Sequence, residues 1–376
     1  MVFLDKKKQN DKGKIILLFP LSNVLGHLSR TLALAEQLSE DNFKVYIAVS
    51  DYYKDLFYLI DPRITLISTL EMCADSTKKF GQIYYDNQNN LQEKEILENS
   101  TQLKPKELKR RSKILKQILK KDTEIIEQLK PDAIILDYHY PPLMVEALKK
   151  TEVFLLSNKI GYPSLCNRIF GGYPYPLNTY KKLVPSIASF DSTTDNESDD
   201  WLYCGIFSWK GWRKIASKVP KNDVFLFFGS TGCTEKLTPW LIENLSDRYK
   251  LSYLSTDNQD GQFINLDTYI NQTKLVICHG GHGTVLECIL KKKPMLIIPN
   301  NLEQLEIGKR VQTLKLGVLI SKPYDKITIN ELTTSINRLL GDKVIKQHLS
   351  SFSEKISKEN GVEKATNIIK NKLNGR

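Results

Sequence analysis

Short apolar runs alternate with segments of helical periodicity along most of the chain. Runs rich in Val, Ile, Leu and Phe, bounded by polar or turn residues, predict strands at 14–19, 44–49, 64–68, 133–136, 153–157, 201–205, 224–231, 274–278 and 293–299. Apolar residues three and four positions apart predict helices at 28–38, 104–129 and from about 329 onward. Because strands alternate with helices, the pattern predicts an α/β fold with parallel sheets built from βαβ units.

The length and the changes in polarity divide this pattern in two. A chain of 376 residues is long for one hydrophobic core, and two domains of Rossmann type accommodate it. The stretch 185–200 turns polar and acidic, and we expect the part from Asp191 to Asp200 to form an exposed loop. We therefore place a first domain at 1–205, a linker at 206–222, a second domain at 223–350 and a closing helix at 351–376.

The formal charge of +11 indicates an acidic partner, such as nucleic acid, an anionic membrane surface or a phosphorylated substrate. Much of the charge lies at 104–121, beside an apolar stripe at helical spacing made of Leu108, Leu115, Ile118, Leu119, Ile125, Ile126 and Leu129. This basic amphipathic helix suits contact with an anionic leaflet or a lipid-linked acceptor, although a solvated surface helix explains it more simply. Nucleic-acid binding is not expected, because no aromatic residues interleave with the charges.

Cysteine spacing and the absence of long apolar runs indicate the compartment. The six cysteines, at positions 73, 166, 204, 233, 278 and 288, have no Cys-x-x-Cys spacing and lie mostly among apolar residues. They are typical of reduced thiols in a cytosolic protein, and no metal site is expected. The lysine-rich start has no apolar signal segment, and no run approaches the roughly 20 residues of a spanning helix. We predict a cytoplasmic protein, soluble or peripheral to the inner face of the membrane.

The segment 278–287, Cys-His-Gly-Gly-His-Gly-Thr-Val-Leu-Glu, joins an apolar strand to a helix. Its glycines allow positive φ and close backbone approach at three positions, Gly280, Gly281 and Gly283. Thr284 opens the helical pattern. Unpaired amides and the helix dipole favour an anion at such a start, so the turn predicts a diphosphate site, with His279 as a further contact. A simpler alternative is an ordinary turn with a capping box formed by Thr284 and Glu287.

The next forty residues contain, in order, a second apolar strand ending at Pro299, the pair Glu303–Gln304 and a later Gly317–Val318. Together with the glycine turn, this order resembles the nucleotide-sugar signature of the GT-B glycosyltransferases: His-Gly-Gly-x-Gly-Thr, a Glu three residues on, a Pro-ending strand, an Asp/Glu-Gln pair and a Gly-Val. The resemblance implies a GT-B fold, in which two Rossmann-like domains face each other across a cleft and the last helix crosses back to the first domain.

A second candidate site lies at the carboxyl end of the first strand, where Gly26-His27 leads into a helix. Ligands of open α/β sheets bind at this edge. An acceptor hydroxyl must lose its proton to attack an anomeric carbon, and an imidazole titrates near neutral pH, so His27 is a candidate base. Its Gly-His-x-x placement resembles the catalytic histidine of family 1 glycosyltransferases. This resemblance implies that Asp137, which ends the strand 133–136, orients the imidazole and stabilises its charged form; His139 is a minor alternative.

The resemblance implies an inverting, metal-independent transferase that moves a sugar from a UDP- or dTDP-sugar to a hydroxyl acceptor, small and lipophilic or lipid-linked. No Asp-x-Asp pair for a divalent ion is present, and helix amides are expected to hold the diphosphate. No cofactor is expected besides the nucleotide-sugar co-substrate. The donor is expected to contact Ser230, His279, Gly281, His282, Gly283 and Thr284 through its diphosphate, Glu287 through its ribose, Glu303 and Gln304 through its sugar, and Ile264 through its base.

Two departures from the family pattern leave alternatives open. Arg30 stands where many members have Pro in Gly-His-x-x-Pro, and Gly-His-x-x-Arg also occurs in nucleotide-sugar hydrolases of the same fold, in which the histidine activates water. The aromatic residues of the insertion 71–129 and of 169–175 suit an acceptor pocket and favour the transferase. The base-stacking Trp of plant members has no clear equivalent, so uridine and thymidine donors both stay open. A third alternative, a non-catalytic nucleotide-sugar-binding subunit of a membrane-associated transferase, is disfavoured by the presence of His27 and Asp137.

Overall fold

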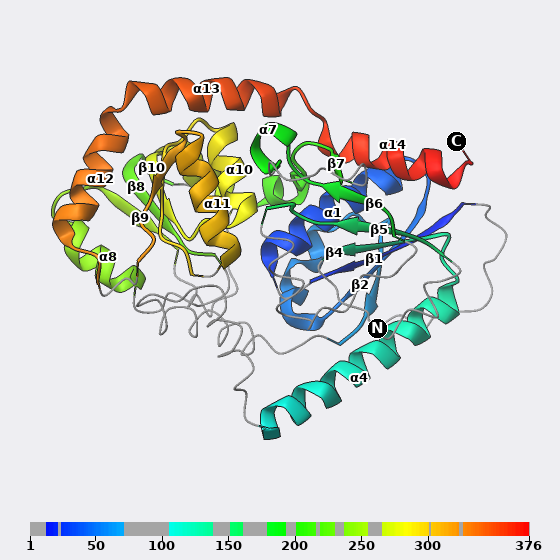
Figure 1. Ribbon diagram of the computed structural model, residues 1–376. Coiled ribbons are helices and arrows are strands. Elements are labelled where there is room, and N and C mark those ends of the chain that lie inside the picture. The colour runs from blue at the N-terminus through cyan, green and yellow to red at the C-terminus, as the bar shows by residue number, and fades with distance from the viewer. Residues whose placement is uncertain are drawn as a thin grey trace.

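The computed structural model describes residues 13–21, 24–70, 105–137, 151–160, 179–192, 201–215, 219–229, 237–254, 265–300, 302–322 and 326–375. They form two parallel β-sheets that lie next to each other, with helices packed against each sheet (Figure 1). The predicted α/β fold class is therefore confirmed. Ser230, Ile264 and His139 lie outside the described residues.

The first sheet has seven parallel strands in the order β3-β2-β1-β4-β5-β6-β7. The strands are β1 (Ile15–Pro20), β2 (Lys44–Val49), β3 (Thr65–Ser68), β4 (Ala133–Asp137), β5 (Glu152–Leu156), β6 (Thr179–Val184) and β7 (Trp201–Tyr203). The helical segments of this half are α1 (Leu25–Glu40), η1 (Asp51–Leu59), α4 (Pro105–Leu129), α7 (Ala188–Asp191) and η2 (Lys210–Lys214).

Both faces of the first sheet are buried. Ile16 and Leu18 of β1 pack on the side of α1, whereas Leu17 and Phe19 pack on the side of α4. Strands buried on both faces are continuous apolar runs, which is why these strands are recognisable in the sequence. In the β1–β4 ladder Pro20 is opposite Asp137, so both strands end at the same level of the sheet.

The second sheet has five parallel strands in the order β12-β11-β10-β8-β9. The strands are β8 (Asn222–Phe227), β9 (Leu251–Tyr253), β10 (Thr273–Cys278), β11 (Met295–Ile297) and β12 (Gly317–Leu319). The helices of this half are α8 (Leu237–Leu245), α9 (Leu266–Gln272), α10 (His282–Leu290), α11 (Leu302–Thr313), α12 (Ile329–Gly341) and α13 (Lys343–Ser357).

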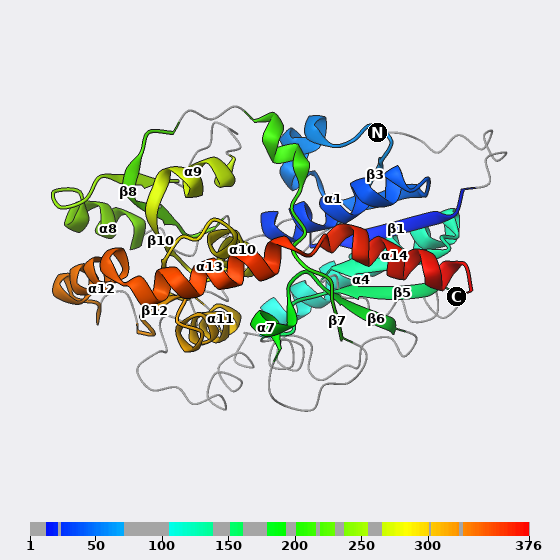
Figure 2. The ribbon, with the colours of Figure 1, turned by 90° about the horizontal axis from the view of Figure 1, so that it is seen from above.

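The last helix, α14 (Gly361–Leu373), packs against α1, whereas α13 before it packs against α10 (Figure 2). Ala365 and Ile369 of α14 are buried in the same hydrophobic cluster as the α1 residues. The chain between α13 and α14 passes so close to Gly205 that a Cβ on Gly361 would lie 2.5 Å from the Gly205 carbonyl. The C-terminal helix thus belongs to the core of the first sheet.

The acidic stretch from position 191 begins differently from the prediction. Asp191 is fully buried at the end of α7, so the predicted exposed loop is wrong at this residue; 193–200 lie outside the described residues. Ile187 and Phe190 of the same segment belong to the hydrophobic cluster of the second sheet. Burial of these apolar neighbours carries Asp191 inward, and hydrogen bonds satisfy its carboxylate.

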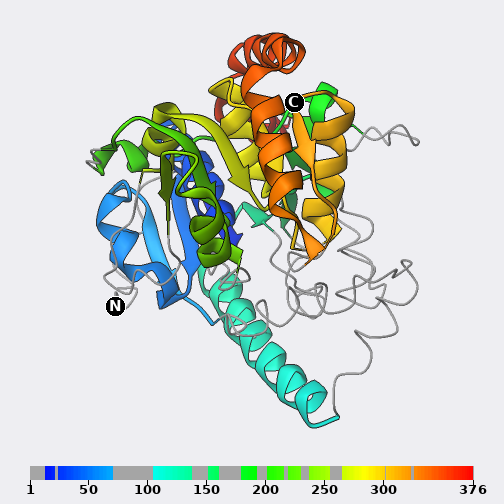
Figure 3. The ribbon, with the colours of Figure 1, turned by 90° about the vertical axis from the view of Figure 1, so that its left-hand side faces the viewer.

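Helix α4 extends well below the sheets at its N-terminal end (Figures 1 and 3). The apolar stripe packs against the first sheet through Leu119, Ile125 and Ile126, with Leu129 partly buried beside them; Ile118 is buried as well. Lysines 113, 116, 120 and 121 are exposed. The described part of the stripe therefore faces the protein, and lysines cover the outer face. Among the described residues, no helix is long and apolar enough to cross a membrane.

Candidate active site

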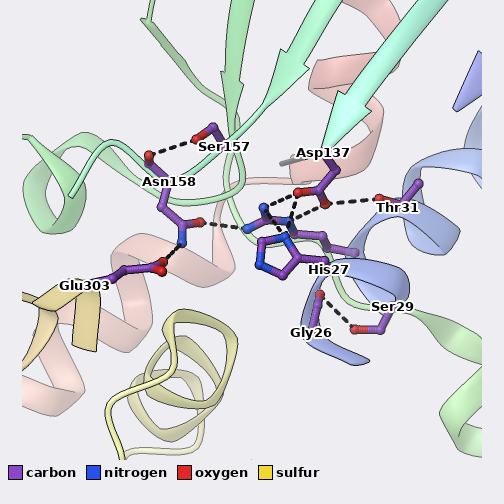
Figure 4. A network of polar contacts seen from close by, with 9 residues as sticks. Gly26, His27, Ser29, Thr31, Asp137, Ser157, Asn158 and Glu303 are labelled. Carbon is purple, nitrogen blue, oxygen red and sulfur yellow. Dashed lines mark hydrogen bonds and ion pairs between the residues drawn. The ribbon is translucent and has the colours of Figure 1, made fainter. Parts of the chain in front are cut away.

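His27 and Asp137 meet at the carboxyl edge of the first sheet. His27 lies in the first turn of α1, directly after β1, and Asp137 is the last residue of the neighbouring strand β4. Nδ1 of His27 is 2.7 Å from Oδ1 of Asp137 (Figure 4). The Asp137 side chain is fully buried, whereas the His27 side chain is 15% exposed. One carboxylate oxygen is thus held against the imidazole at the edge where ligands of α/β folds bind.

Arg30 also holds the carboxylate of Asp137, a contact that was not among the predicted ones. Its Nε donates to Oδ2 of Asp137 over 2.7 Å, and its Nη2 donates to Oδ1. Thr31 Oγ1 also donates to Oδ2, over 3.0 Å. Burial alone would raise the pKa of the Asp137 carboxyl, but the charges of Arg30 and His27, and then their hydrogen bonds, hold that pKa below its usual value. Asp137 therefore remains a carboxylate.

Asn158 connects this group to the other half of the molecule. It follows β5 at the same edge of the sheet, and its Oδ1 accepts a 2.7 Å bond from Nη1 of Arg30. Its Nδ2 donates over 2.8 Å to Oε1 of Glu303, in the first turn of α11 (Figure 4). Glu303, predicted to bind the donor sugar, therefore lies within one hydrogen-bonded group with the His27–Asp137 pair.

The glycine turn connects β10 to α10. Helix α10 begins at His282, with Gly281 as its N-cap residue and no side-chain cap bond. The predicted helix start at Thr284 is therefore wrong by two residues, and the capping box does not form. The only one of its three glycines with positive φ is Gly280, at +87°. The first amides of α10 are left without helical partners, which is the arrangement that suits an anion.

His279 is buried between two glycines. A Cβ on Gly281 would lie 2.7 Å from Nε2 of His279, and one on Gly229 would lie 2.8 Å from Cε1. Nδ1 is buried and has no hydrogen-bond partner among the described residues. Burial lowers the pKa of this imidazole to about 4, despite a small opposing effect of the Phe227 carbonyl. His279 is therefore neutral near pH 7 and offers one N–H without a positive charge.

His282 has a partner in the first half of the chain. Its Nε2 lies 2.9 Å from Oδ2 of Asp191, and both side chains are buried. Oδ1 of Asp191 accepts the amide of Ile160. Arg310 of α11 adds bonds of 2.8 and 2.9 Å to the carbonyls of Phe190 and Ser189 in α7. The His282 side chain, predicted to contact the diphosphate, is therefore engaged with α7, and its backbone amide remains at the start of α10.

The remaining predicted donor residues surround the turn on α10 and α11. Glu287 is half-buried on α10. Burial and then the charge of Asp267 raise its pKa, and the charge of Lys291 and a hydrogen bond with Ser208 partly offset this rise. Oε1 of Gln304 accepts the amide of Asn300 over 2.7 Å and so fixes the loop after β11. Gly283 is exposed, and Thr284 is buried in the first turn.

Comparisons of sequence and of structure relate this chain to known proteins. Residues 246–365 match the glycosyltransferase family 28 C-terminal domain. The UDP-sugar-dependent glycosyltransferase 52 of Dictyostelium discoideum is 31% identical over 98 residues, 26% of this chain and 6% of that protein. The zeaxanthin glucosyltransferase of Pseudescherichia vulneris is 28% identical over 113 residues, 30% of this chain and 27% of that protein. The matched segments thus span about a quarter or less of these curated relatives.

Solved structures match over almost the whole chain. The glycotransferase of kitacinnamycin superposes with a TM-score of 0.73 and 15% identity, over 96% of this chain and 99% of that chain. Spinosyn rhamnosyltransferase SpnG, complexed with thymidine diphosphate, superposes with a TM-score of 0.64 and 15% identity, over 95% and 100%. At these identities the likeness shows the fold. The chain therefore has the fold of the GT-B glycosyltransferases, and its residues 246–365 match the glycosyltransferase family 28 C-terminal domain.

Proposed function

We propose that this protein is an inverting glycosyltransferase that moves a sugar from a UDP- or dTDP-sugar to a hydroxyl acceptor, with His27 as the base. The observation that carries the proposal is the hydrogen-bonded group that joins His27 and Asp137 to Glu303. It holds a candidate base and a candidate donor-sugar residue, which come from different halves of the chain, at one site. Such an arrangement suits transfer between two substrates bound on opposite sides.

The base chemistry follows from the contacts of His27. With the Nδ1 proton donated to Asp137, Nε2 is the atom that accepts the proton of the acceptor hydroxyl. The oxygen then forms a bond to the anomeric carbon while the bond to the nucleoside diphosphate breaks, and attack from the opposite face inverts that carbon. The carboxylate of Asp137 stabilises the imidazolium formed in this step.

The leaving diphosphate is proposed to bind at the start of α10. The amides of His282, Gly283 and Thr284 are available there, because the first helical bond runs from the amide of Val285 to the carbonyl of Gly281. The buried Nδ1 of His279 gains a partner if a phosphate oxygen lies beside it. Ser230 completes the proposed contacts. Since these groups stabilise the departing charge without an ion, we expect transfer to continue in EDTA.

The rest of the donor is assigned to the remaining predicted residues. Glu287 is proposed to accept hydrogen bonds from the ribose hydroxyls, which would replace the contact with Ser208. Glu303 and Gln304 are proposed to bind the sugar, and Ile264 to line the base pocket. The charge of Glu303 makes it a strong acceptor for sugar hydroxyls.

The acceptor is proposed to be lipophilic or lipid-linked. Two relatives are named for such acceptors: the zeaxanthin glucosyltransferase and the sterol 3-beta-glucosyltransferase of Vanderwaltozyma polyspora, which is 30% identical over 95 residues, 25% of this chain and 8% of that protein.

The segment 104–121 is proposed to contact an anionic membrane through the exposed lysines of α4. Cosedimentation with vesicles tests this contact. Binding to phosphatidylserine vesicles that is lost when Lys113, Lys116, Lys120 and Lys121 become Glu supports it, and equal binding of both proteins overturns it.

The function is tested by incubating the purified protein with UDP- and dTDP-sugars, with and without a library of hydroxyl acceptors, in the presence and absence of EDTA. Release of the nucleoside diphosphate that needs an acceptor and gives a product heavier by one sugar supports transfer. The anomeric coupling in the NMR spectrum of that product tests inversion. Rapid release of free sugar without an acceptor, lost in His27→Ala, supports the hydrolase instead.

A further inference from the structure

Arg30 occupies the centre of the hydrogen-bonded group. It is 8% exposed, and three of its nitrogens contact different parts of the site. Nε and Nη2 donate to the two oxygens of Asp137, and Nη1 donates to Asn158. Nη2 also lies 2.9 Å from Nδ1 of His27. A planar guanidinium makes such a paired contact with a carboxylate, whereas the point charge of a lysine does not.

In the described part of the chain, the charges around His27 come from three elements. Arg30 lies on α1 with His27, Asp137 ends β4, and Glu303 lies on α11 behind Asn158. Lys159 follows Asn158, but its ammonium faces the ring of Tyr203 at 5.9 Å from the centroid. Without Arg30, protonated His27 would therefore be the only cation that contacts Asp137 among the residues that the structure describes. The site would then favour the imidazolium, which is unable to act as a base.

We propose that Arg30 is a positioning residue of the transfer reaction proposed above, on which this role rests. It fixes Asp137 against His27 and offsets part of the negative charge that this carboxylate presents to the imidazole. Asn158 holds the guanidinium in place and ties it to Glu303, so that the base and the donor-sugar residue keep a fixed relation across the two sheets.

The bridging amide has one orientation that satisfies both neighbours. Asn158 is 2% exposed, its oxygen must face the guanidinium, and its nitrogen must face the carboxylate of Glu303. An aspartate at this position would keep an acceptor for Arg30, but it would repel Glu303 and compete with Asp137 for the guanidinium. Asn158→Asp thus disturbs the same charge balance from a second residue without removing Arg30.

The test is the titration of His27, followed by NMR of protein with ¹⁵N-labelled histidine. The chain has five histidines, and the signal of His27 is the one lost in His27→Ala. In Arg30→Gln we expect the titration midpoint of His27 to rise by about one to three pH units, the usual effect of a neighbouring charge. Arg30→Lys keeps the cation but not the paired contact, so its midpoint should move less. Asn158→Asp should shift the midpoint upward.

Kinetics provide the second measurement. If Arg30 acts through the protonation of His27, kcat/KM of Arg30→Gln falls at pH 7 and recovers toward alkaline pH, because the acidic limb of the profile moves upward. In Arg30→Lys the loss should be nearly equal at all pH values. A role of Arg30 in folding alone would lower kcat/KM without moving the limb.

An unchanged or lower His27 midpoint in folded Arg30→Gln overturns the proposal. If that variant does not fold, an unchanged midpoint in Asn158→Asp has the same meaning. The NMR titration needs no sugar transfer. If the His27 midpoint shifts in Arg30→Gln but the wild-type protein transfers no sugar, the role of Arg30 is supported and the proposed function is rejected. If the wild-type protein transfers sugar but the midpoint does not shift, the proposed function is supported and the role of Arg30 is rejected.

Discussion

Two histidines of the site differ in the groups that surround them, and this decides what each can do. His27 lies at the sheet edge, where its Nδ1 is held against the carboxylate of Asp137 and its side chain is still 15% exposed. His279 is buried between glycines, and burial lowers its pKa to about 4. His27 therefore suits a group that gains a proton during the reaction, and His279 suits a neutral hydrogen-bond donor.

Replacing His27 with Ala should remove transfer while leaving the fold intact. Removal of a general base typically costs about 10²- to 10⁴-fold in rate. Asp137 keeps its bonds from Arg30 and Thr31 in this variant, so the buried carboxylate remains satisfied. The rate of product formation and the thermal midpoint check the two expectations, with isothermal titration of the donor as the control. A variant that transfers at the wild-type rate would remove His27 from the reaction.

His279 should make the protein sensitive to acid. Its folded pKa of about 4 lies below the ordinary value of 6.5, so between these values the unfolded chain binds a proton that the folded protein does not. Stability from this residue is therefore unaffected above pH 6.5 and decreases by about 1.4 kcal/mol for each pH unit below it, until about pH 4. His279→Asn lacks this proton, so its stability deficit relative to wild type should shrink on acidification. Urea unfolding from pH 7.5 to 4.5 measures this, and a constant deficit contradicts it.

At the residue scale, the sequence was enough to predict the site residues that directly follow a strand. His27 and Asp137 follow apolar runs directly, and adjacent parallel strands end at one edge. Arg30 has a local signal, since it lies one helical turn after His27 and shares its face of α1. Asn158 shares the strand-end signal, since it follows the predicted strand at 153–157, but its partner Glu303 lies 145 positions away. Asp191 has no such signal, and its partner His282 lies 91 positions away.

The two turns that connect strands to helices at the candidate site present different groups to a ligand. The turn into α1 presents a side chain, His27, whereas the turn into α10 presents backbone amides. The second needs glycine at positions where a Cβ would meet the imidazole of His279, as at Gly281, but not at Gly283, where the space is open. In a turn that binds an anion through its backbone, the choice of residue is therefore limited both by neighbouring side chains and by the close approach of the ligand.

Substitution at the two glycines at the start of α10, the N-cap residue Gly281 and Gly283, should distinguish the effect of packing from the effect of the ligand. Gly281→Ala pushes a methyl group into His279 and should destabilise the protein by about 1–3 kcal/mol. Gly283→Ala meets no atom within 4 Å and lies in a helix, so it should stabilise the fold by about 0.4–1 kcal/mol. If the diphosphate approaches this backbone, Gly283→Ala should still weaken nucleoside diphosphate binding. Urea unfolding and calorimetric titration with UDP and dTDP give both quantities. Unchanged affinity in Gly283→Ala would place the diphosphate elsewhere.

Helix α7 shows what pattern analysis at the element scale misses. The segment looks like the start of a polar loop, because only Ile187 and Phe190 are strongly apolar. Their burial in the cluster of the second sheet is a tertiary effect, and the bonds from His282 and Arg310 follow from it. A short helix with four residues has no periodicity to detect, so its position depends on contacts that are distant in sequence.

At the scale of the whole molecule, each half of the chain contributes a segment that packs with the sheet of the other half. Ile187 and Phe190, which precede β7 in the chain, pack with the second sheet, and Ala365 and Ile369, near the C-terminus, pack with the first. The alternation of strands and helices was enough to predict two parallel sheets. It was not enough to predict these exchanges, because an apolar helix face does not specify which of two similar sheets it covers. The predicted domain boundaries stay a prediction.

The passage from α13 to α14 provides a test of how tightly the halves are joined. A Cβ on Gly361 would lie 2.5 Å from the carbonyl atoms of Gly205 and from the carbonyl oxygen of Ile206, all of them backbone atoms that cannot rotate away. We expect Gly361→Ala to cost about 1–3 kcal/mol or more, because relief requires α14 to shift on α1. Gly341→Ala, at the end of α12, meets nothing within 4 Å and is the matched control.

Urea unfolding followed by tryptophan fluorescence distinguishes the outcomes. Trp209 packs in the core of the first sheet, whereas Trp240 lies on α8 beside the second, so Trp240→Phe leaves probes that report on the first half. If α14 holds the first half together, Gly361→Ala should lower the midpoint of that half in this background, and Gly341→Ala should not. Equal midpoints for the two variants would mean that the backbones separate at little cost, and that α14 adds little to the stability of the first sheet.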